Sequence, residues 1–285
     1  MGPAWQASKT RSIPIINSWS ISRQRPARRC DSPSRATTGL HRQFGNSAYT
    51  QCRSSSGLMA TFRHFERLRP EELDEALRDA PIAFVPLGSI EFHGWHLPLG
   101  FDALKAAALC ERVAAETGGV VMPPTFFGFA GLHGEYHGSI ISEEAPFEAH
   151  LRVMLQRLAV MGFKVIVVLT GHYPGEQVAA AKRVADEASA AWSDVTIFAL
   201  AEHEAYPNEM RGDHAAKWET SIALEIMPEL VNLEALDDNP EPLHGIYGED
   251  PRSEASVELG KETVDTIVST LAGIVHGALR LRRKR

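Results

Sequence analysis

The sequence predicts an α/β fold with three layers, in which helices cover both faces of a mostly parallel central sheet. The first observation is that short apolar runs alternate with amphipathic segments of helical length, which is typical of a parallel sheet. The second is the run KVIVVL at residues 164–169, which is β-branched and continuously apolar. Such a strand has no face suited to water, so we expect it to be central and covered on both sides.

The predicted elements follow in order from residue 69. They are a helix at 69–78, a strand at 81–87, a helix at 103–117, a short strand at 120–124, a helix at 143–161, a strand at 164–169, a helix at 176–192, a strand at 195–200, a helix at 214–230 and a last helix at 256–281. Pro70 suits the first turn of the first helix, and Asp102 can cap the second. Gly118 and Gly162 follow two of the helices, where glycine commonly ends them.

The first 58 residues differ from the rest in composition. They contain nine Lys or Arg and one acid, Asp31, whereas the remaining 227 residues contain 20 basic and 35 acidic side chains. The segment is rich in Ser, Arg and Pro and has no sustained periodicity, so it buries too little apolar surface to fold. We predict a disordered basic extension at 1–58 and one folded domain at 59–285.

Three explanations of the basic extension stay open. Translation from an upstream start, with Met59 as the true start, is the simplest of them. A transit peptide is also rich in Arg and Ser and poor in acids. A nucleic-acid-binding arm would be basic too, but aromatic residues are sparse in this segment.

The composition of the whole chain argues against several classes of partner. The net charge of −7 gives no general reason to expect nucleic acid or an acidic membrane surface. No apolar run approaches the roughly 18 residues that a membrane span needs. The three cysteines form neither a CxxC motif nor an even framework, which is typical of a reduced compartment. We therefore expect a cytoplasmic protein.

Four side chains with metal-ligand chemistry follow the predicted strand at 81–87 within one short loop. They are Glu91, His93, His96 and Asp102. Parallel strands end at the same edge of a sheet, so this loop should meet the loops after the strands at 164–169 and 195–200.

These residue types could hold two cations. Glu91 and His93 are two residues apart and would point the same way in an extended chain. Asp102 has two oxygens that could bridge two cations, and His172 and Glu219 could add ligands. Mixed histidine and carboxylate ligands suit zinc, manganese or iron, and two such ions can activate a shared water molecule.

Each of these residues also has a structural interpretation. Asp102 could serve only as a helix cap, and His172 could be a loop histidine that bonds to the backbone. The combination is harder to explain in that way, because burying this many polar groups in one loop is costly without a cation.

The same stretch resembles a known family. PLGSIEFHGWHLPLGFD at 86–102 closely resembles the creatininase (creatinine amidohydrolase) signature PLGSxEQHGxHLPLxTD. LHGEYHGSI, VIVVLTGHY and GDHAAKWETS resemble three further segments of that family, in the same order. The resemblance covers about residues 65–235. It implies a three-layer α/β/α fold, a hydrolase with two metal ions, and a homo-oligomer, a hexamer in the family.

The resemblance also implies roles for single metal ligands. Glu91 and His172 correspond to ligands of one metal, and His93 corresponds to a ligand of the other. Asp102 corresponds to the carboxylate that bridges them. Glu219 could support the second metal.

The same resemblance implies roles for residues that are not metal ligands. His214 stands at the position of the catalytic histidine, with Asp213 in place of a neighbouring acid. Tyr173 could contact substrate or simply pack beside its neighbours. His96, His133 and His137 are expected near the mouth of the site and not as ligands.

The chain departs from the family pattern at several positions. Phe92 and Phe101 replace the usual Gln and Thr, and we expect them to influence substrate preference. Pro174 stands where creatininase has a metal-binding Glu, which leaves Glu219 and Glu176 as alternatives for the fifth ligand. The loop before the catalytic histidine lacks the tryptophans that pack against creatinine, so we do not expect creatinine to be the substrate.

The resulting hypothesis is a metal-dependent hydrolase that uses a metal-bridging hydroxide to cleave a C–N amide bond, cyclic or formyl, in a small molecule. We expect two divalent ions, zinc or manganese, with iron as a third option. Two alternatives stay open. One is hydrolysis of another bond, such as a cyclic keto-sugar ring or a peptide. The other is a non-catalytic member that binds a metabolite or acts in maturation, which the intact set of candidate ligands disfavours.

Overall fold

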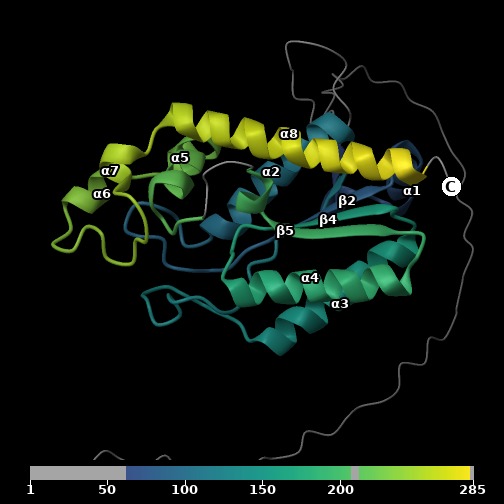
Figure 1. Cartoon of the computed structure of the whole chain (residues 1–285), viewed down its shortest axis with the longest axis horizontal. Helices are drawn as coiled ribbons and strands as arrows, with labels where there is room; N and C mark the ends of the chain where they lie inside the picture. The colour runs from purple at the N-terminus through teal and green to yellow at the C-terminus, as the bar shows by residue number, and fades with distance from the viewer. Residues whose placement is uncertain (1–61, 207–211, 283–285) are drawn as a thin grey trace, which may run out of the picture. The chain divides into compact units, whose positions relative to one another are not determined.

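The computed structural model describes residues 62–206 and 212–282 (Figure 1). The strands are β1 (Phe62–His64), β2 (Ile82–Leu87), β3 (Gly119–Val121), β4 (Val165–Thr170) and β5 (Thr196–Ala201). The longer helices are α1 (Pro70–Asp79), α2 (Phe101–Thr117), α3 (Glu144–Met161), α4 (Gly175–Ala191), α5 (Lys217–Ile226) and α8 (Val257–Arg282). The short helical elements are α6 (Glu234–Asp237), α7 (Pro251–Glu254) and the 3₁₀ turns η1 (Phe65–Arg67), η2 (Glu202–Ala205) and η3 (Pro228–Leu230).

The strands form one parallel sheet in the order β1-β3-β2-β4-β5. β2 and β4 pair along their whole length, with Leu87 beside Thr170 at their carboxyl ends. Thr170 in turn lies beside Ala201, the last residue of β5. The predicted parallel sheet is confirmed, and the apolar run at 164–169 lies inside the sheet, between β2 and β5.

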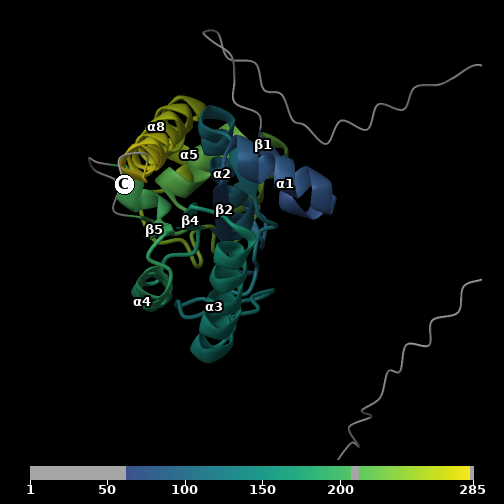
Figure 2. The ribbon, with the colours of Figure 1, turned by 90° about the vertical axis from the view of Figure 1, so that its right-hand side faces the viewer.

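Helices cover both faces of this sheet (Figures 1 and 2). Alternate residues of each strand point to opposite faces. On β2, Ile82 and Phe84 join the core cluster beneath α2, α5 and α8, whereas Ala83 and Val85 join the cluster beneath α3 and α4. The two clusters make the three predicted layers, and they explain why the central strands are apolar at every position.

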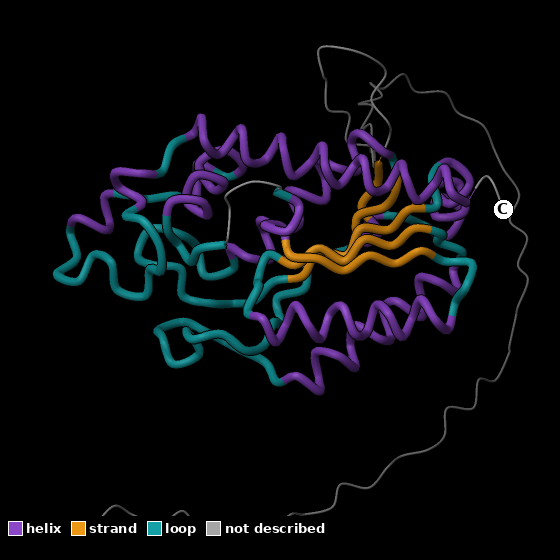
Figure 3. The backbone as a smooth tube through the Cα atoms, in the orientation of Figure 1, coloured by secondary structure: helices purple, strands orange, loops and turns teal. Residues whose placement is uncertain are grey.

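The order of the strands places a crevice between β2 and β4. The chain leaves β2 through α2 on one face to reach β3, and it returns through α3 on the other face to reach β4. The neighbours of β2 are therefore reached in opposite directions, which creates a topological switch point. Ligands of open α/β sheets bind at such points, outside the carboxyl ends of the strands. Figure 3 shows the long loops gathered at one end of the strands.

Two glycines bring the ends of β2 and β4 against the start of α2. A Cβ atom on Gly88 would lie 2.1 Å from the Ala103 nitrogen, and one on Gly171 would lie 2.2 Å from the Asp102 carbonyl oxygen. Both contacts are with backbone atoms, which cannot turn away. Glycine is therefore required at both positions if Asp102 is to lie directly above the switch point.

Most predicted elements are confirmed within two or three residues. The exception is the helix predicted at 214–230, because α5 begins only at Lys217 and ends at Ile226, where η3 follows. Residues 214–216 instead lie in extended or left-handed backbone, with Ala215 at a φ of 53°. The short strand β1 was not predicted, because three residues are too few to show a periodicity.

Helix α8 is the one described helix that is long and apolar enough to span a membrane by length and composition. Its residues Val264, Ile267 and Leu271 pack in the core cluster shared with α2 and α5. The apolar stripe is thus accounted for by packing over the sheet. The expectation that no membrane is a partner stays a prediction.

The predicted extension at 1–58 lies outside the described residues. Its disorder and its three possible origins therefore stay predictions, as does the cytoplasmic location.

The close approach at Gly171 leads to a test of stability. Replacing Gly171 by Ala should lower the free energy of unfolding by about 1–3 kcal/mol, because the new methyl group overlaps backbone that must then shift. Gly175 is the matched control, since nothing lies within 4 Å of a Cβ atom added there. Denaturant unfolding should show Gly175→Ala unchanged or slightly more stable; equal losses in both variants would contradict the steric argument.

Candidate metal centre

Candidate ligand atoms from four segments meet beyond the carboxyl ends of β2 and β4. Within the described part of the chain they form three groups, and in each group the nitrogen and oxygen atoms lie within 4.8 Å of one another. The groups are Glu91, Asp102 and His172; His93, His214 and Glu219; and Glu91, His133 and His214. All five side chains predicted as metal ligands are thus brought together, although they come from segments up to 128 residues apart in the sequence, Glu91 to Glu219.

Asp102 lies at the centre, buried in the first turn of α2. Its Oδ1 is 2.9 Å from His93 Nε2, and its Oδ2 is 3.0 Å from His172 Nδ1. The Ser89 hydroxyl donates to Oδ2 at 2.6 Å. The interpretation of Asp102 as a helix cap is wrong, because Gly100 occupies that position and no side chain caps the helix there. Its carboxylate instead faces a histidine on each side.

Backbone carbonyls orient the two histidines that flank Asp102. His93 Nδ1 is 3.0 Å from the Glu91 carbonyl oxygen, and His172 Nε2 is 3.2 Å from the Phe129 carbonyl oxygen. In the neutral form each ring donates its N–H to that carbonyl. The lone pair of the other nitrogen then points toward Asp102, which is how histidine ligands are usually held.

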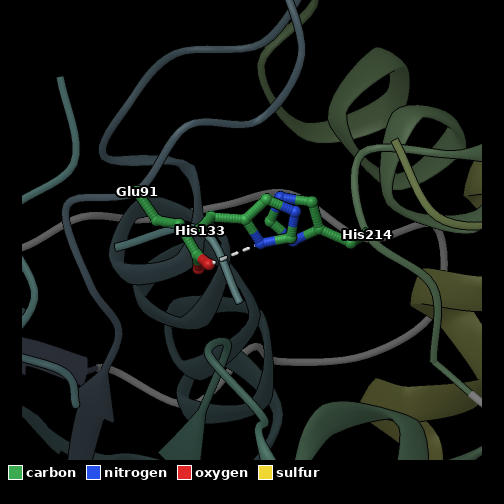
Figure 4. A group of neighbouring side chains, drawn as sticks. All are labelled: Glu91, His133 and His214. Atoms are coloured by element: carbon green, nitrogen blue, oxygen red, sulfur yellow. Dashed lines mark hydrogen bonds and ion pairs between the residues drawn. The ribbon is translucent and has the colours of Figure 1, made fainter. Parts of the chain in front are cut away.

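A third histidine, His133, joins the site from the loop at 125–142. Its Nδ1 is 2.9 Å from Glu91 Oε1, and its ring stacks on that of His214 with centroids 3.8 Å apart (Figure 4). His133 is buried and lines the cavity, and it belongs to a group of candidate ligand atoms, which the sequence did not lead us to expect. Its place could have been suspected from the LHGEYHGSI segment, but a histidine in a glycine-rich loop shows no periodicity that fixes its direction.

The other two histidines of that expectation lie elsewhere. His96 is buried, with Nε2 2.8 Å from the Thr220 hydroxyl, and His137 is exposed. Neither belongs to any of the three groups of candidate ligands.

Glu219 supplies a further carboxylate from the first turn of α5. Its Oε2 accepts the Ala215 N–H at 2.7 Å and lies 3.7 Å from His93 Nε2. Glu176, the alternative fifth ligand, is exposed in the first turn of α4 and belongs to none of the three groups. Of the two alternatives, the geometry therefore favours Glu219.

Asp213 and Tyr173 are both engaged within the protein. The Asp213 carboxylate accepts the backbone N–H groups of Trp218 at 2.7 Å and Glu219 at 3.1 Å, which stabilises the start of α5. The Tyr173 hydroxyl lies 2.6 Å from the Asp213 carbonyl oxygen and 2.9 Å from Glu219 Oε1, and it can donate to one of them at a time. Both residues line the cavity, but their polar groups are aimed at the protein.

The pKa values reflect burial and charge together. Burial alone would lower the pKa of His93, but Asp102 raises it to about 9. Burial likewise opposes the charge of His172, and hydrogen bonds to Asp102 and Glu91 raise its pKa to about 10. Burial would raise the pKa of Glu91, but hydrogen bonds from His133 and His172 lower it to about 2. Without a metal, two imidazolium groups therefore neutralise the carboxylates.

The pKa of His214 is shifted in the opposite direction, downward. Burial, together with the charge on His93, lowers the pKa of His214 to about 4. Its Nε2 is 2.8 Å from the Phe92 carbonyl oxygen, so the neutral ring donates there and keeps a free lone pair on Nδ1. His214 is thus neutral near pH 7 and able to accept a proton.

The arrangement fits divalent cations. The Nε2 atoms of His93 and His133 are buried and have no hydrogen-bond partner of good geometry. Buried nitrogens without a well-aligned hydrogen bond are costly, and a cation bound between these atoms and the neighbouring carboxylates would satisfy them. Histidine and carboxylate donors together suit zinc, manganese or iron.

An open cavity of about 390 Å³ leads to these groups. Its outer wall is formed by Leu132, His203 and Tyr247, among others. Phe92 and Phe101, which we expected to influence substrate preference, are buried and do not line the cavity. They contact residues of the site instead: the Phe92 carbonyl accepts a hydrogen bond from His214, and the Phe101 ring lies 5.4 Å from that of His93. Their influence on substrate preference stays a prediction.

Comparison with known sequences finds one matching family model and several relatives. Residues 66–275 match the family model described as creatininase, creatinine amidohydrolase. Creatinine amidohydrolase of Pseudomonas putida is 26% identical over 194 residues, which are 60% of this chain and 75% of that protein. 3-Dehydro-scyllo-inosose hydrolase of Thermotoga maritima is 25% identical over 62% of this chain and 60% of that protein. Mycofactocin precursor peptide peptidase of Mycobacterium ulcerans is 31% identical over 67% of this chain and 85% of that protein.

Solved structures show the same fold. A crystal structure of creatininase superposes with a TM-score of 0.65 at 22% identity, covering 74% of this chain and 96% of that one. Two further creatininase structures, one described as Mn and one a variant of Zn-Zn type, each give a TM-score of 0.64 at 22% identity over 75% of this chain and 97% of theirs. At this identity the likeness shows the fold alone.

The raised histidine pKa values predict how pH affects the metal-free protein. A group whose pKa is raised by folding stabilises the fold fully below its unfolded pKa, near 6.5, and loses that contribution as pH rises through its folded pKa. For His93 and His172 the window is therefore pH 6.5 to about 10. The melting temperature of chelator-treated protein should fall across this window.

Two controls separate this effect from general alkaline unfolding. Metal-loaded protein should lose less stability, because the cations hold the imidazoles in their neutral form. The His172→Ala variant should lack its share of the loss. A chelated protein whose melting temperature is flat or rises between pH 6.5 and 10 would contradict the charge assignment.

Proposed function

Because the chain belongs to the creatininase family of hydrolases, we propose that it holds two divalent cations around Asp102 and hydrolyses a C–N amide bond, cyclic or formyl, in a small molecule. One observation carries this proposal. The two oxygens of the buried Asp102 carboxylate face different histidines, His93 at 2.9 Å and His172 at 3.0 Å. One carboxylate shared between two sets of donors is what a pair of neighbouring cations needs.

The donors divide around that carboxylate. Glu91 and His172 would hold one cation with Asp102, and His93 and Glu219 would hold the other. Bound there, divalent ions such as zinc or manganese lower the pKa of a water molecule and attract the carbonyl oxygen of the substrate. The Glu91 carboxylate is kept in place by His133, whose Nδ1 lies 2.9 Å from Oε1.

The chain's own proton carrier is His214. Its ring is fixed between those of His93 and His133, at centroid distances of 4.3 and 3.8 Å. Because Nε2 is bonded to the Phe92 carbonyl, Nδ1 is the atom that can take a proton and deliver it to the leaving nitrogen. Asp213 supports this step indirectly, since its carboxylate accepts the backbone N–H groups of Trp218 and Glu219 in the first turn of α5 and leaves the proton transfer to the histidine.

The size of the cavity and the relatives of the chain bear on which bond is cleaved. A cavity of about 390 Å³ suits a small molecule, which supports an amide of that size. The identity of 31% to a peptide peptidase supports peptide cleavage as the alternative, and 25% to an inosose hydrolase supports ring opening of a keto-sugar. The complete ligand set supports an enzyme rather than a non-catalytic binding protein, in which these buried groups would have no use.

Metal content and turnover test the proposal together. We expect wild-type protein, reconstituted with zinc or manganese, to contain two ions per chain by plasma mass spectrometry and to hydrolyse small cyclic or formyl amides. His172→Ala should lose at least one ion and lower kcat/KM by more than the roughly 100-fold that indirect changes at metal sites cause. The matched control is His137→Ala, because His137 is exposed on the loop at 125–142.

The substrate panel separates the alternatives. Keto-sugars and short peptides in the same assay decide which bond is cleaved, and cleavage of either in place of amides would replace the amide hypothesis. Wild-type protein that holds no stoichiometric divalent ion, with turnover indifferent to chelator, would overturn the metal mechanism itself.

We also propose that the chain forms a homo-oligomer, a hexamer by family resemblance. Phe127, Leu132 and Ile140 on the loop at 125–142 are 66%, 76% and 64% exposed, and apolar side chains gathered on one loop are suited to a subunit interface. Sedimentation equilibrium should give a mass several times that of one chain. Charged substitutions at Phe127 and Ile140 should reduce that mass, and a monomeric wild-type protein would contradict the proposal.

A further inference from the structure

A buried lysine lies directly behind the candidate metal centre. Lys105, on α2, is fully buried, with its Nζ 2.5 Å from Glu219 Oε1 and 2.5 Å from Glu202 Oε1. Its ammonium also lies over the rings of Phe101 and Tyr173, 5.0 and 4.8 Å from their centroids. Nothing in the sequence pattern marks it, because a lysine on an amphipathic helix usually faces water. A buried ammonium is retained only where carboxylates compensate its charge.

The lysine fixes the orientation of the Glu219 carboxylate. Oε1 accepts a hydrogen bond from the Lys105 ammonium and lies 2.9 Å from the Tyr173 hydroxyl. Oε2 accepts the Ala215 N–H at 2.7 Å and lies 3.7 Å from His93 Nε2. One oxygen is thus turned toward α2 and away from the histidines, so the other is the oxygen presented to His93.

The end of β4 offers no carboxylate that could replace Glu219 beside His93. The residues that follow His172 at the end of β4 are Tyr173, Pro174 and Gly175, and Glu176 is exposed. Among the described residues, the carboxylates that pair with His93 Nε2 are therefore Asp102 and Glu219 alone. Glu219 and Asp102 belong to different helices, so nothing in α2 itself holds the Glu219 carboxylate in position. A freely rotating Glu219 side chain would therefore weaken this set of donors.

Glu202 holds the lysine from its other side. It is fully buried in η2, and its oxygens have no hydrogen-bond partner of good geometry beyond their closeness to the ammonium. The ion pair therefore joins η2 and α2, and through Glu219 it reaches α5. Glu202 does not belong to any of the three groups of candidate ligands.

We propose that Lys105 is a positioning residue for Glu219: it binds one carboxylate oxygen so that the other can ligate a cation together with His93 and Asp102. The inference rests on the proposed function. It predicts an asymmetric effect, because the ion pairs of Lys105 are with Glu219 and Glu202 and not with Glu91 or His172. Loss of the lysine should weaken one cation and spare the other.

The experiment compares two variants that differ only at position 105. Lys105→Met alone would leave Glu202 buried and unpaired, which can prevent folding. In E202M the lysine keeps its bond to Glu219, and in K105M/E202M the pair is replaced by apolar side chains of similar volume. Zn²⁺ content and dissociation constants are measured by competition with a chromogenic chelator, and folding is followed by thermal unfolding.

We expect E202M to bind two Zn²⁺ ions as wild type does. K105M/E202M should bind one ion with unchanged affinity and the other about 10- to 100-fold more weakly, the usual effect of removing a group that orients a ligand. Glu219→Gln should weaken the same ion. Adding Glu219→Gln to K105M/E202M should cause little further loss, whereas a lysine that only stabilises the fold would leave the two effects additive.

Each other outcome overturns the inference. If K105M/E202M binds both ions as tightly as E202M, Lys105 does not position a ligand, and the proposed function is unaffected. If both ions weaken equally, the effect is general and not transmitted through Glu219. If wild-type protein binds no Zn²⁺ stoichiometrically, the proposed function and this inference fail together.

Discussion

The constraint on which this structure depends is the compensation of buried negative charge. Four carboxylates, Glu91, Asp102, Glu202 and Glu219, are buried within one region of the domain, and Lys105 is the one buried ammonium among them. Such a concentration of charge is stable only where cations or protons balance it. In the absence of metal the balance comes from protonated histidines, whose pKa values are raised accordingly, and divalent cations would take over this role.

The fold supplies the means of bringing these charges together. β2 and β4 end in register at the switch point of the sheet, and α2 starts immediately above them. Gly88 and Gly171 permit that contact, because a side chain at either position would overlap the backbone around Asp102. The central carboxylate also lies in the first turn of α2, where the helix dipole favours a negative charge. Packing and electrostatics thus place Asp102 at the same point.

Around this centre the residues act in two layers. The inner layer offers nitrogen and oxygen atoms to the cavity, and the outer layer fixes their direction. Ser89 bonds to Asp102, and the Phe92 carbonyl bonds to His214. Lys105 belongs to the outer layer, and so does Asp213, whose carboxylate bonds to backbone N–H groups of α5. The side chains of Ser89, Lys105 and Asp213 are charged or polar for reasons of orientation, so their residue type alone does not identify them as catalytic.

The sequence by itself determined the order of the strands and long helices after β1, the parallel sheet and the set of residues with ligand chemistry. These properties are local: apolar periodicity, turn residues and the polar residues that end each strand can be read within one short window. Only the tertiary structure decided which atoms meet. It brought His133 beside Glu91, favoured Glu219 over Glu176, excluded Asp102 as a helix cap and revealed Lys105 behind Glu219. Those contacts join segments far apart in the chain, and their distances are set by strand register and helix packing, which no single window contains.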